Sequence, residues 1–422
     1  AEIFAAARAL KERVYGNPLP GGAADIAFDA DGGMAVVGAH TLDLFTDRDA
    51  WIHHVDAGGA IDWQWSFDAD PELHALHTVA ATSDGGYLAA GSTAFAPEPP
   101  ISAWAVKLDG GGNVVWQRQY HGGVAEHANF AIETMDGGYA LAGWTTSSGA
   151  GATDAWLLKL TGTGAVEWQK TYGGSGAEEA TGLIQTADGG YALAAFTDTW
   201  PASGHGAWIL RLDAGGGLLW HAVMEDWGDF RDVIQTADGD LLATGRMSGP
   251  GGNDLWAVKF RDADGDVLWQ RAYEGPLGDW GSGAVELHDR SLLIGGVWGF
   301  GFAEEDIWIQ RTDSYGTIPS CGLIRETAIP ATSPAVTVAP AGAVASPPAP
   351  SPEPVAFVSA PSAAAVDEKC RAVAGAGDRG PRAAGRRLTA YPSPVREAGI
   401  IAFELEAAER VRLDVVGPGG TR

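Results

Sequence analysis

The chain has 422 residues, and the 45% that are hydrophobic are enough for at least one sizeable core. Its 60 glycines and its low content of charged residues, 19%, favour many short strands joined by tight turns over long helices. The net charge of −27 argues against a general nucleic-acid binder, because binding to phosphates needs clustered Lys and Arg. No apolar run approaches the roughly 20 residues that a membrane-spanning helix needs.

Residues 1–14 form an N-terminal segment that lacks the pattern of a signal peptide. Residues 10–16 end in Tyr15-Gly16, as the fourth strand of a later repeat ends in Tyr172-Gly173. We therefore expect the N-terminal segment to supply the strand that completes the last repeat. The alternative is that residues 317–323 supply that strand.

Residues 15–325 contain a repeat of about fifty residues, and a fixed period of this length is typical of a repeat architecture. A turn that is Asp-Gly-Gly in its complete form recurs at Asp31, Asp84, Asp136, Asp188, Asp238 and Asp289. A Trp that opens an apolar strand recurs at Trp51, Trp104, Trp156, Trp208, Trp256 and Trp308. A second Trp near the end of the unit recurs at Trp63, Trp116, Trp168, Trp220 and Trp269. These markers predict six units, with a seventh as the main alternative.

Within one unit, apolar runs separated by turn residues predict four short strands; in the fourth unit they cover residues 181–186, 191–197, 207–212 and 218–223. A four-stranded sheet with two apolar faces must stack against neighbours, and a ring of stacked sheets removes the exposed ends. The sequence thus predicts an all-β, six-bladed β-propeller of four-stranded blades. We expect Trp104 and Trp116 to be cross-strand neighbours that pack between blades.

The unit with Asp154-Ala155-Trp156, Tyr172-Gly173-Gly174 and Asp188-Gly189-Gly190-Tyr191 resembles the repeats of bacterial and archaeal secreted β-propeller proteins. This resemblance implies a fold and a secreted or cell-surface location, but no catalytic residue.

After the repeats, residues 326–386 are rich in Pro and Ala and are predicted to be a linker. Residues 387–422 are predicted to form a partial β-sandwich. Their Tyr391-Pro392-Ser393-Pro394 and the strand-like runs that follow resemble the opening of the C-terminal sorting domain of type IX secretion, which implies export and surface attachment. Cys321 and Cys370 are the only cysteines; a disulfide between them and two free thiols both remain open.

Six Trp residues fall outside the repeat pattern, at strand ends or connections on the variable loop face of the propeller. Acidic residues gather on the same face, and aromatic rings among carboxylates are typical of a sugar-binding or protein-binding surface. The alternative is that these Trp side chains only plug loops. The candidate ligand-binding residues are Trp144, Trp200, Trp227, Trp280, Trp298, Glu178, Glu179, Asp229 and Asp279.

The sequence therefore predicts a monomeric, noncatalytic binding or scaffold module for a glycan or a surface protein, with no cofactor and no metal. The calcium-like segment from Asp262 to Asp266 lies on an expected hairpin turn. One alternative is a carbohydrate-active hydrolase that uses acidic residues on the loop face. A lesser alternative is a quinoprotein-type oxidoreductase, since the hairpin from Leu108 to Trp116 resembles the tryptophan-docking hairpin of that family.

Overall fold

The computed structural model describes residues 21–41, 48–67, 72–95, 101–249, 252–273, 279–298, 306–318, 324–327, 329–340 and 344–346, and four three-residue strands nearer the C-terminus. All regular structure in these ranges is β-strand. None of the described residues belongs to a helix that is long and apolar enough to cross a membrane.

The strands form successive antiparallel sheets whose strand order follows the chain. Sheet 1 comprises β1 (Gly21–Phe28), β2 (Met34–Thr41), β3 (Arg48–Val55) and β4 (Ile61–Phe67). Sheet 2 comprises β5 (Glu72–Ala81), β6 (Tyr87–Phe95), β7 (Ile101–Leu108) and β8 (Val114–His121). Sheet 3 comprises β9 (Glu126–Glu133), β10 (Tyr139–Thr145), β11 (Asp154–Leu160) and β12 (Val166–Gly173).

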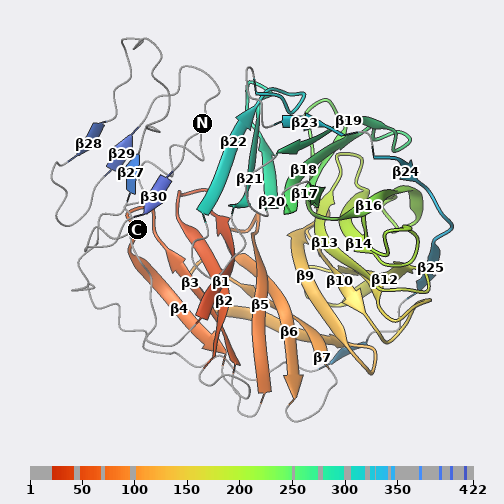
Figure 1. Cartoon of the computed structure of the whole chain (residues 1–422). Helices are drawn as coiled ribbons and strands as arrows, with labels where there is room; N and C mark the ends of the chain where they lie inside the picture. Colours follow the sequence, from red (N-terminus) through yellow and green to blue (C-terminus); the bar gives the residue numbers. More distant parts are fainter. Residues whose placement is uncertain are drawn as a thin grey trace.

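Sheet 4 comprises β13 (Glu178–Gln185), β14 (Tyr191–Thr197), β15 (Gly206–Leu212) and the first part of β16 (Leu218–Gln235). Sheet 5 comprises the second part of β16, β17 (Leu241–Gly249), β18 (Gly252–Phe260) and β19 (Val267–Tyr273). Sheet 6 has three described strands, β20 (Asp279–Glu286), β21 (Leu292–Trp298) and β22 (Asp306–Thr312). The sheets follow one another in chain order, and the first strands of neighbouring sheets are in contact (Figure 1). This all-β, repeated arrangement is propeller-like.

The predicted strands of the fourth unit agree closely with β14 and β15, but the fourth strand does not end at residue 223. It continues without a break as the first strand of sheet 5, so β16 belongs to two sheets. In β15 every residue is buried, because apolar neighbours cover both faces of the sheet. Each sheet therefore depends on the next one for its core.

The Trp of each fourth strand packs on a glycine in the last hairpin of the following sheet. These pairs are Trp63 with Gly112, Trp116 with Gly164, Trp168 with Gly216, Trp220 with Gly265, and Trp269 with Gly316. At Gly216, φ is +72°, and a Cβ would lie 2.8 Å from the Trp168 ring. Glycine is required there for both reasons, and its carbonyl also accepts a hydrogen bond of 2.7 Å from the Tyr172 hydroxyl.

The expected cross-strand pair of Trp104 and Trp116 is wrong. Trp104 lies opposite Gln119, and Trp116 lies opposite Lys107. The hairpin closes through a bond from the Asp109 amide to the Asn113 carbonyl, and a bulge beside Leu108 shifts the register further. The two Trp side chains still lie between sheets, but they contact different neighbours.

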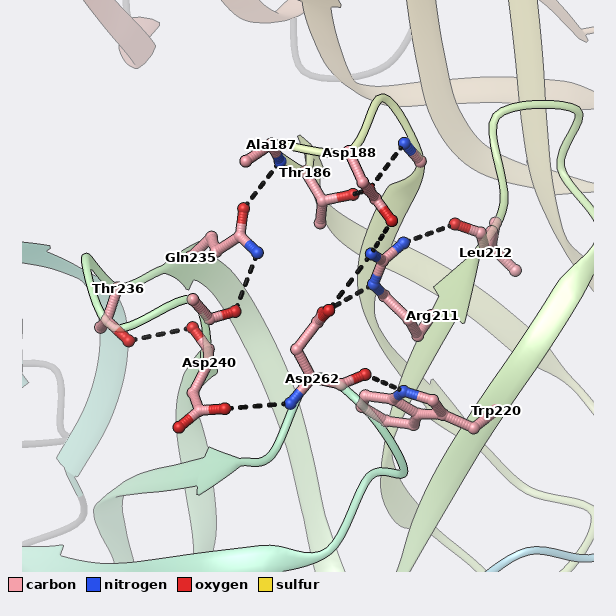
Figure 2. A network of polar contacts seen from close by, with 12 residues as sticks. Thr186, Ala187, Asp188, Arg211, Leu212, Trp220, Gln235, Thr236, Asp240 and Asp262 are labelled. Atoms are coloured by element: carbon pink, nitrogen blue, oxygen red, sulfur yellow. Dashed lines mark hydrogen bonds and ion pairs between the residues drawn. The ribbon is translucent and has the colours of Figure 1, made fainter.

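A buried cation reinforces the junction between sheets 4 and 5 (Figure 2). The Arg211 side chain is 2% exposed and forms ion pairs of 2.6 Å with Asp188 of its own sheet and 2.7 Å with Asp262 of the next. Its Nη1 donates to the Leu212 carbonyl. Lys107 and Lys159 form the corresponding ion pairs with the hairpin aspartates of sheets 2 and 3. The hydroxyl of Thr186 and the Arg211 guanidinium lower the pKa of Asp188 to about 2.

The first strands carry a one-residue β-bulge at the same place in each sheet. The bulged residues are Ala24, His77, Asn129, Thr181, Arg231 and Ser282. Three of their side chains bond to a backbone carbonyl of the following sheet: His77 to Ala128, Asn129 to Ala180, and Thr181 to Phe230. In sheets 2, 3 and 4 the bulge therefore turns one polar side chain toward the following sheet.

In sheets 1 and 5, the aspartate that follows the bulged residue makes the hydrogen bond to the neighbouring sheet. Asp25 accepts hydrogen bonds from the Thr78 hydroxyl and the Val79 amide, and Asp232 accepts one of 3.0 Å from the Ala284 amide. Burial raises the pKa of Asp232 to about 6, and the negative charge of Asp25 adds to this shift. Burial likewise raises the pKa of Asp25.

Residues 324–346 pass along the outer edges of four sheets, and we call this segment the belt. β23 (Ile324–Glu326) pairs with β19, β24 (Ala331–Thr332) with β16, β25 (Thr337–Pro340) with β12, and β26 (Val344–Ser346) with β8. The belt thus visits sheets 5, 4, 3 and 2 in turn, against the direction of the chain. The sequence predicted most of this segment to be a linker. Its composition does not reveal the strand pairing, because backbone groups make those hydrogen bonds.

Two further pairs of short strands lie near the C-terminus: β27 (Cys370–Ala372) with β30 (Leu413–Val415), and β28 (Thr389–Tyr391) with β29 (Ile400–Ala402). The partial sandwich and the sorting-domain resemblance stay predictions. Residues 10–16 and Cys321, and with it the question of a disulfide, lie outside the described residues. Residues 317 and 318 are described and are not part of a strand.

We predict that Arg211→Met lowers the free energy of unfolding by about 2–4 kcal/mol, because it leaves two aspartates at the junction without their cation. The loss should stay below that of a fully buried pair, since Asp188 is 59% exposed. Denaturant unfolding measures it. Arg261→Met is the matched control, because Arg261 pairs with Asp264 and Asp266 at the surface and should matter little. Equal losses in both variants would contradict the role assigned to Arg211.

We predict that Asp232→Asn stabilises the protein at pH 8 by about 1–3 kcal/mol and leaves stability unchanged near pH 4. The folded pKa of Asp232 lies above its unfolded value, so the folded protein retains this proton more tightly. Stability from this group is fully present below about pH 4 and is lost as the pH rises through about 6. Thermal unfolding across this pH range tests the sign, with the exposed Asp31→Asn as the charge control. Destabilisation at pH 8 would show that the ionised carboxylate supports the fold.

Candidate binding site at the loop ends of sheets 3 to 5

Large polar and aromatic side chains occupy one pair of cross-strand positions at the loop ends of sheets 3 to 5. The pairs are His127 with Trp144, Glu179 with Phe196, and Asp229 with Arg246. In sheets 1 and 2 the same positions hold Gly22 with Ala39 and Ala75 with Ser92. Side chains directly opposite each other in an antiparallel pair lie on the same face. Sheets 3 to 5 therefore present a surface that sheets 1 and 2 lack.

Three aromatic rings form a column that joins sheets 2 and 3. His77 stacks on His127 with ring centroids 4.6 Å apart, and His127 stacks on Trp144 at 5.0 Å. The Nδ1 atom of His77 lies 3.2 Å from the Ala128 carbonyl, which fixes the orientation of the first ring. All three side chains are partly exposed. The column therefore offers a rigid, largely apolar ring face to a ligand.

Glu179 continues this surface into sheet 4. Its Oε1 atom accepts a hydrogen bond of 2.8 Å from Asn129, whose amide also donates to the Ala180 carbonyl. Burial raises the pKa of Glu179, while Asn129 and the positive charge of Arg231 act against the rise. The carboxyl group is thus held in place from sheet 3 and remains partly exposed.

Asp229 is the buried anchor of the sheet 5 side. Its oxygens pair with Arg231 at 2.9 Å and with Arg246 at 2.8 Å, and the carboxylate is 0% exposed. Burial opposes ionisation, but the interactions with His205, whose Nε2 lies 4.0 Å from Oδ2, and with Arg231 outweigh it and lower the pKa of Asp229. The same interaction with Asp229 raises the pKa of His205.

Trp227 lies over this ionic cluster. The Arg246 guanidinium carbon is 5.1 Å from the Trp227 ring centroid, and the His205 ring is 5.3 Å away. His205 is itself held by Asp198 at 2.6 Å. The ring is therefore fixed from sheets 4 and 5 while part of its surface stays exposed.

We define the sheet 3–5 site as His127, Asn129, Trp144, Glu179, Trp227 and Arg231. Of the residues that the sequence predicted, Trp144, Trp227 and Glu179 belong to it. The buried Asp229 holds Arg231 of the site through an ion pair. Glu178 is 0% exposed and accepts bonds from the Gly174 amide and the Thr197 and Thr199 hydroxyls, so its oxygens serve the loop.

Four further predicted residues do not belong to this site. Trp200 packs against the buried Trp208, with ring centroids 5.4 Å apart, and so acts as a plug. Asp279 and Trp298 are opposite each other at the end of sheet 6, and Trp280 is adjacent; the side chains of these three lie outside the described residues.

The sequence reasoning missed His127, Asn129 and Arg231. Their signal was available, because an alignment of the units places Asn129 and Arg231 at the bulge and His127 at a position that is small in the first two units. Periodicity alone could not find the bulge, since an extra residue shifts the alternation of the strand.

The chemistry of the site favours binding. It combines ring faces with hydrogen-bond donors and acceptors, which suits a ligand with both apolar faces and hydroxyl groups. The ionised carboxylate, Asp229, is already paired with two guanidinium groups and is not free to act as a nucleophile. In the described part of the chain, no three His, Cys, Asp or Glu side chains are grouped so that they could hold a metal ion.

No protein-family model and no curated protein matches the chain. Among solved structures, it is similar to Sqt1 of Chaetomium thermophilum (13% identity, 70% of each chain, TM-score 0.45). It is also similar to proteins of unknown function from Dyadobacter fermentans (14% identity, 71% of this chain and 95% of that one, TM-score 0.43) and Bacteroides caccae (13%, 68% and 96%, TM-score 0.40). Likeness at this level carries no information about the ligand.

Proposed function

We propose that the protein is a noncatalytic binding module that holds a glycan at the sheet 3–5 site. One observation carries the proposal: two partly exposed rings, Trp144 and Trp227, flank hydrogen-bonding groups that come from three adjacent sheets. The apolar faces of a sugar stack on Trp rings, and its hydroxyl groups bond to carboxylate, amide and guanidinium groups. Glu179, Asn129 and Arg231 supply these three kinds of group.

The alternative hydrolase would need two carboxyl groups set across one glycosidic bond, one of them ionised and free. Glu179 meets the requirement for a raised pKa. Asp229 is ionised, but its oxygens are occupied by Arg231 and Arg246. Binding without cleavage is therefore the function that this geometry supports best. A surface protein as ligand is an outcome that the binding screen below distinguishes.

We further propose that the six sheets close into a six-bladed propeller, with residues 10–16 as the fourth strand of sheet 6. Two observations support closure. The charge of Asp25 in β1 contributes to the raised pKa of Asp232 in β16, as a ring that brings the first strands of sheets 1 and 5 toward one centre would require. Gly59, the counterpart of Gly216 in sheet 1, has a φ of +78° and is buried. In the proposed ring, Tyr15 covers Gly59 as Tyr172 covers Gly216.

Export and attachment to the cell surface also stay proposals, supported by the segment that begins at Tyr391. Fractionation of cells that make the full-length chain tests them, and recovery in the cytosol would contradict them.

The Tyr172 hydroxyl bonds to a hairpin carbonyl, so Tyr172→Phe should lower the free energy of unfolding by about 1 kcal/mol. If residues 10–16 close the ring as proposed, we predict the same loss for Tyr15→Phe. Tyr315→Phe is the control, since Tyr315 is 66% exposed. Thermal unfolding of the three variants compares them. If Tyr15→Phe behaves like the control, residues 10–16 do not close the ring in this way.

We predict that Trp144→Ala and Trp227→Ala each weaken glycan binding about 5- to 150-fold, corresponding to about 1–3 kcal/mol for a contact Trp. A screen of neutral oligosaccharides and of peptides identifies the ligand, and calorimetry then measures the affinities. Tyr315→Ala, an exposed aromatic on the hairpin side, should bind like the wild type.

Thermal stability is read for the same variants, so that lost affinity is not confused with unfolding. Glu179→Gln preserves the shape of the site and should weaken binding less than either Trp change. Normal binding by both Trp variants at unchanged stability would overturn the site. Binding confined to the peptide panel would overturn the glycan assignment.

A further inference from the structure

The belt advances by a constant seven residues per sheet. Ile324 lies opposite Tyr273, Ala331 opposite Met224, Val338 opposite Tyr172, and Ala345 opposite Tyr120. The four partners occupy the same position in the fourth strands of sheets 5, 4, 3 and 2. A step of seven extended residues spans at most about 25 Å. The sequence of the belt is therefore matched to the spacing of the sheet edges.

Side chains fix the belt beside its pairing points. The Thr327 hydroxyl donates to Gln270 at 2.8 Å and accepts from the Trp256 ring nitrogen at 3.3 Å. Thr332 donates to Glu225 at 2.7 Å, and Ser333 donates to the His221 carbonyl at 2.5 Å. Ile329 and Val336 pack against the cores of the sheets. The belt is thus seated by backbone, polar and apolar contacts together.

The edges under the belt are ones on which another strand could add. β8 and β12 have eight residues each and β19 has seven, so without the belt they would be long edges with unpaired backbone groups on their outer side. Apolar side chains near these edges are exposed: Val115 by 59%, Leu219 by 57% and Leu268 by 40%. A long edge with exposed apolar residues favours pairing with the same edge of another molecule.

With the belt in place, the outermost strands pair poorly with a further strand. Its strands have only two to four residues, and Pro330, Pro334 and Pro340 interrupt it. Proline has no amide hydrogen to donate, so a further strand cannot pair along the belt without a gap. Short strands and proline are the means by which natural sheets prevent edge-to-edge association.

We propose that the belt is an intramolecular cap that prevents the outer edges of sheets 2 to 5 from pairing with a second copy of this chain. An edge such as β12 is identical in both copies and can pair antiparallel with itself about a two-fold axis. The cap is independent of the sheet 3–5 site, because it covers the outer edges and not the loop ends.

The test uses the seven-residue step in the full-length chain. Deletion of the exposed Ala335 leaves five residues between Ala331 and Val338 in place of six, so we expect one of the two pairs to break. A glycine inserted after Ala335 is the matched control, because extra length can bulge outward. Hydrogen exchange of β12 amides reports the state of the belt, and light scattering at increasing protein concentration reports the mass.

We expect the deletion to speed exchange along β12 and to produce a dimer at high concentration, while the wild type and the insertion variant stay monomeric. A peptide of residues 324–346, added in excess, should reverse the dimer. Near-ultraviolet circular dichroism distinguishes a folded dimer from an aggregate of unfolded chains. Faster exchange without any gain in mass would overturn the proposal, and so would a wild type that dimerises as strongly as the deletion variant. Unchanged exchange along β12 would likewise overturn it, because the seven-residue step would then not be what seats the belt on these edges.

Discussion

The packing of neighbouring sheets centres on one contact that repeats, the Trp of a fourth strand against a hairpin glycine of the next sheet. Neither face of a sheet such as β13–β16 can be left to water, because the strands in its middle are buried on both sides. The glycine brings the next backbone within reach of the ring, and only there can a tyrosine hydroxyl meet a carbonyl. The close approach of neighbouring sheets also buries Arg211, because it places Asp188 of sheet 4 and Asp262 of sheet 5 around one guanidinium group.

Because these contacts lie at the hairpin ends, the loop ends carry little of the packing and are free to vary. Sheets 1 and 2 hold small residues at positions where sheets 3 to 5 hold His127, Glu179 and Asp229. In sheets 2 to 6 the bulge adds a second polar position without altering the core, since it displaces one residue from the ladder. A repeat fold thus gains an asymmetric surface while its six units stay almost equivalent in structure.

The sequence predicted what recurs in every unit: the strands, the turns and the structural Trp residues. It placed Trp144 and Trp227 correctly at the loop ends, because they interrupt the repeat. It could not tell which of Glu178 and Glu179 is exposed. Adjacent residues of a strand face opposite sides, and only the register decides which side is buried. The supposed pairing of Trp104 with Trp116 failed for a related reason, as a bulge near the hairpin changes the register without changing the composition.

The belt shows why composition misleads at the end of the repeats. Proline, alanine and serine cannot build a core, so the segment reads as a linker. A strand that caps an existing edge, however, needs no core of its own, because the edge supplies the backbone partners and the sheet supplies the apolar surface. Small residues and prolines suit this task, since they add no bulk and leave no new edge. The informative signal is the seven-residue spacing of Ile324, Ala331, Val338 and Ala345. It can be recognised only once the spacing of the sheets is known.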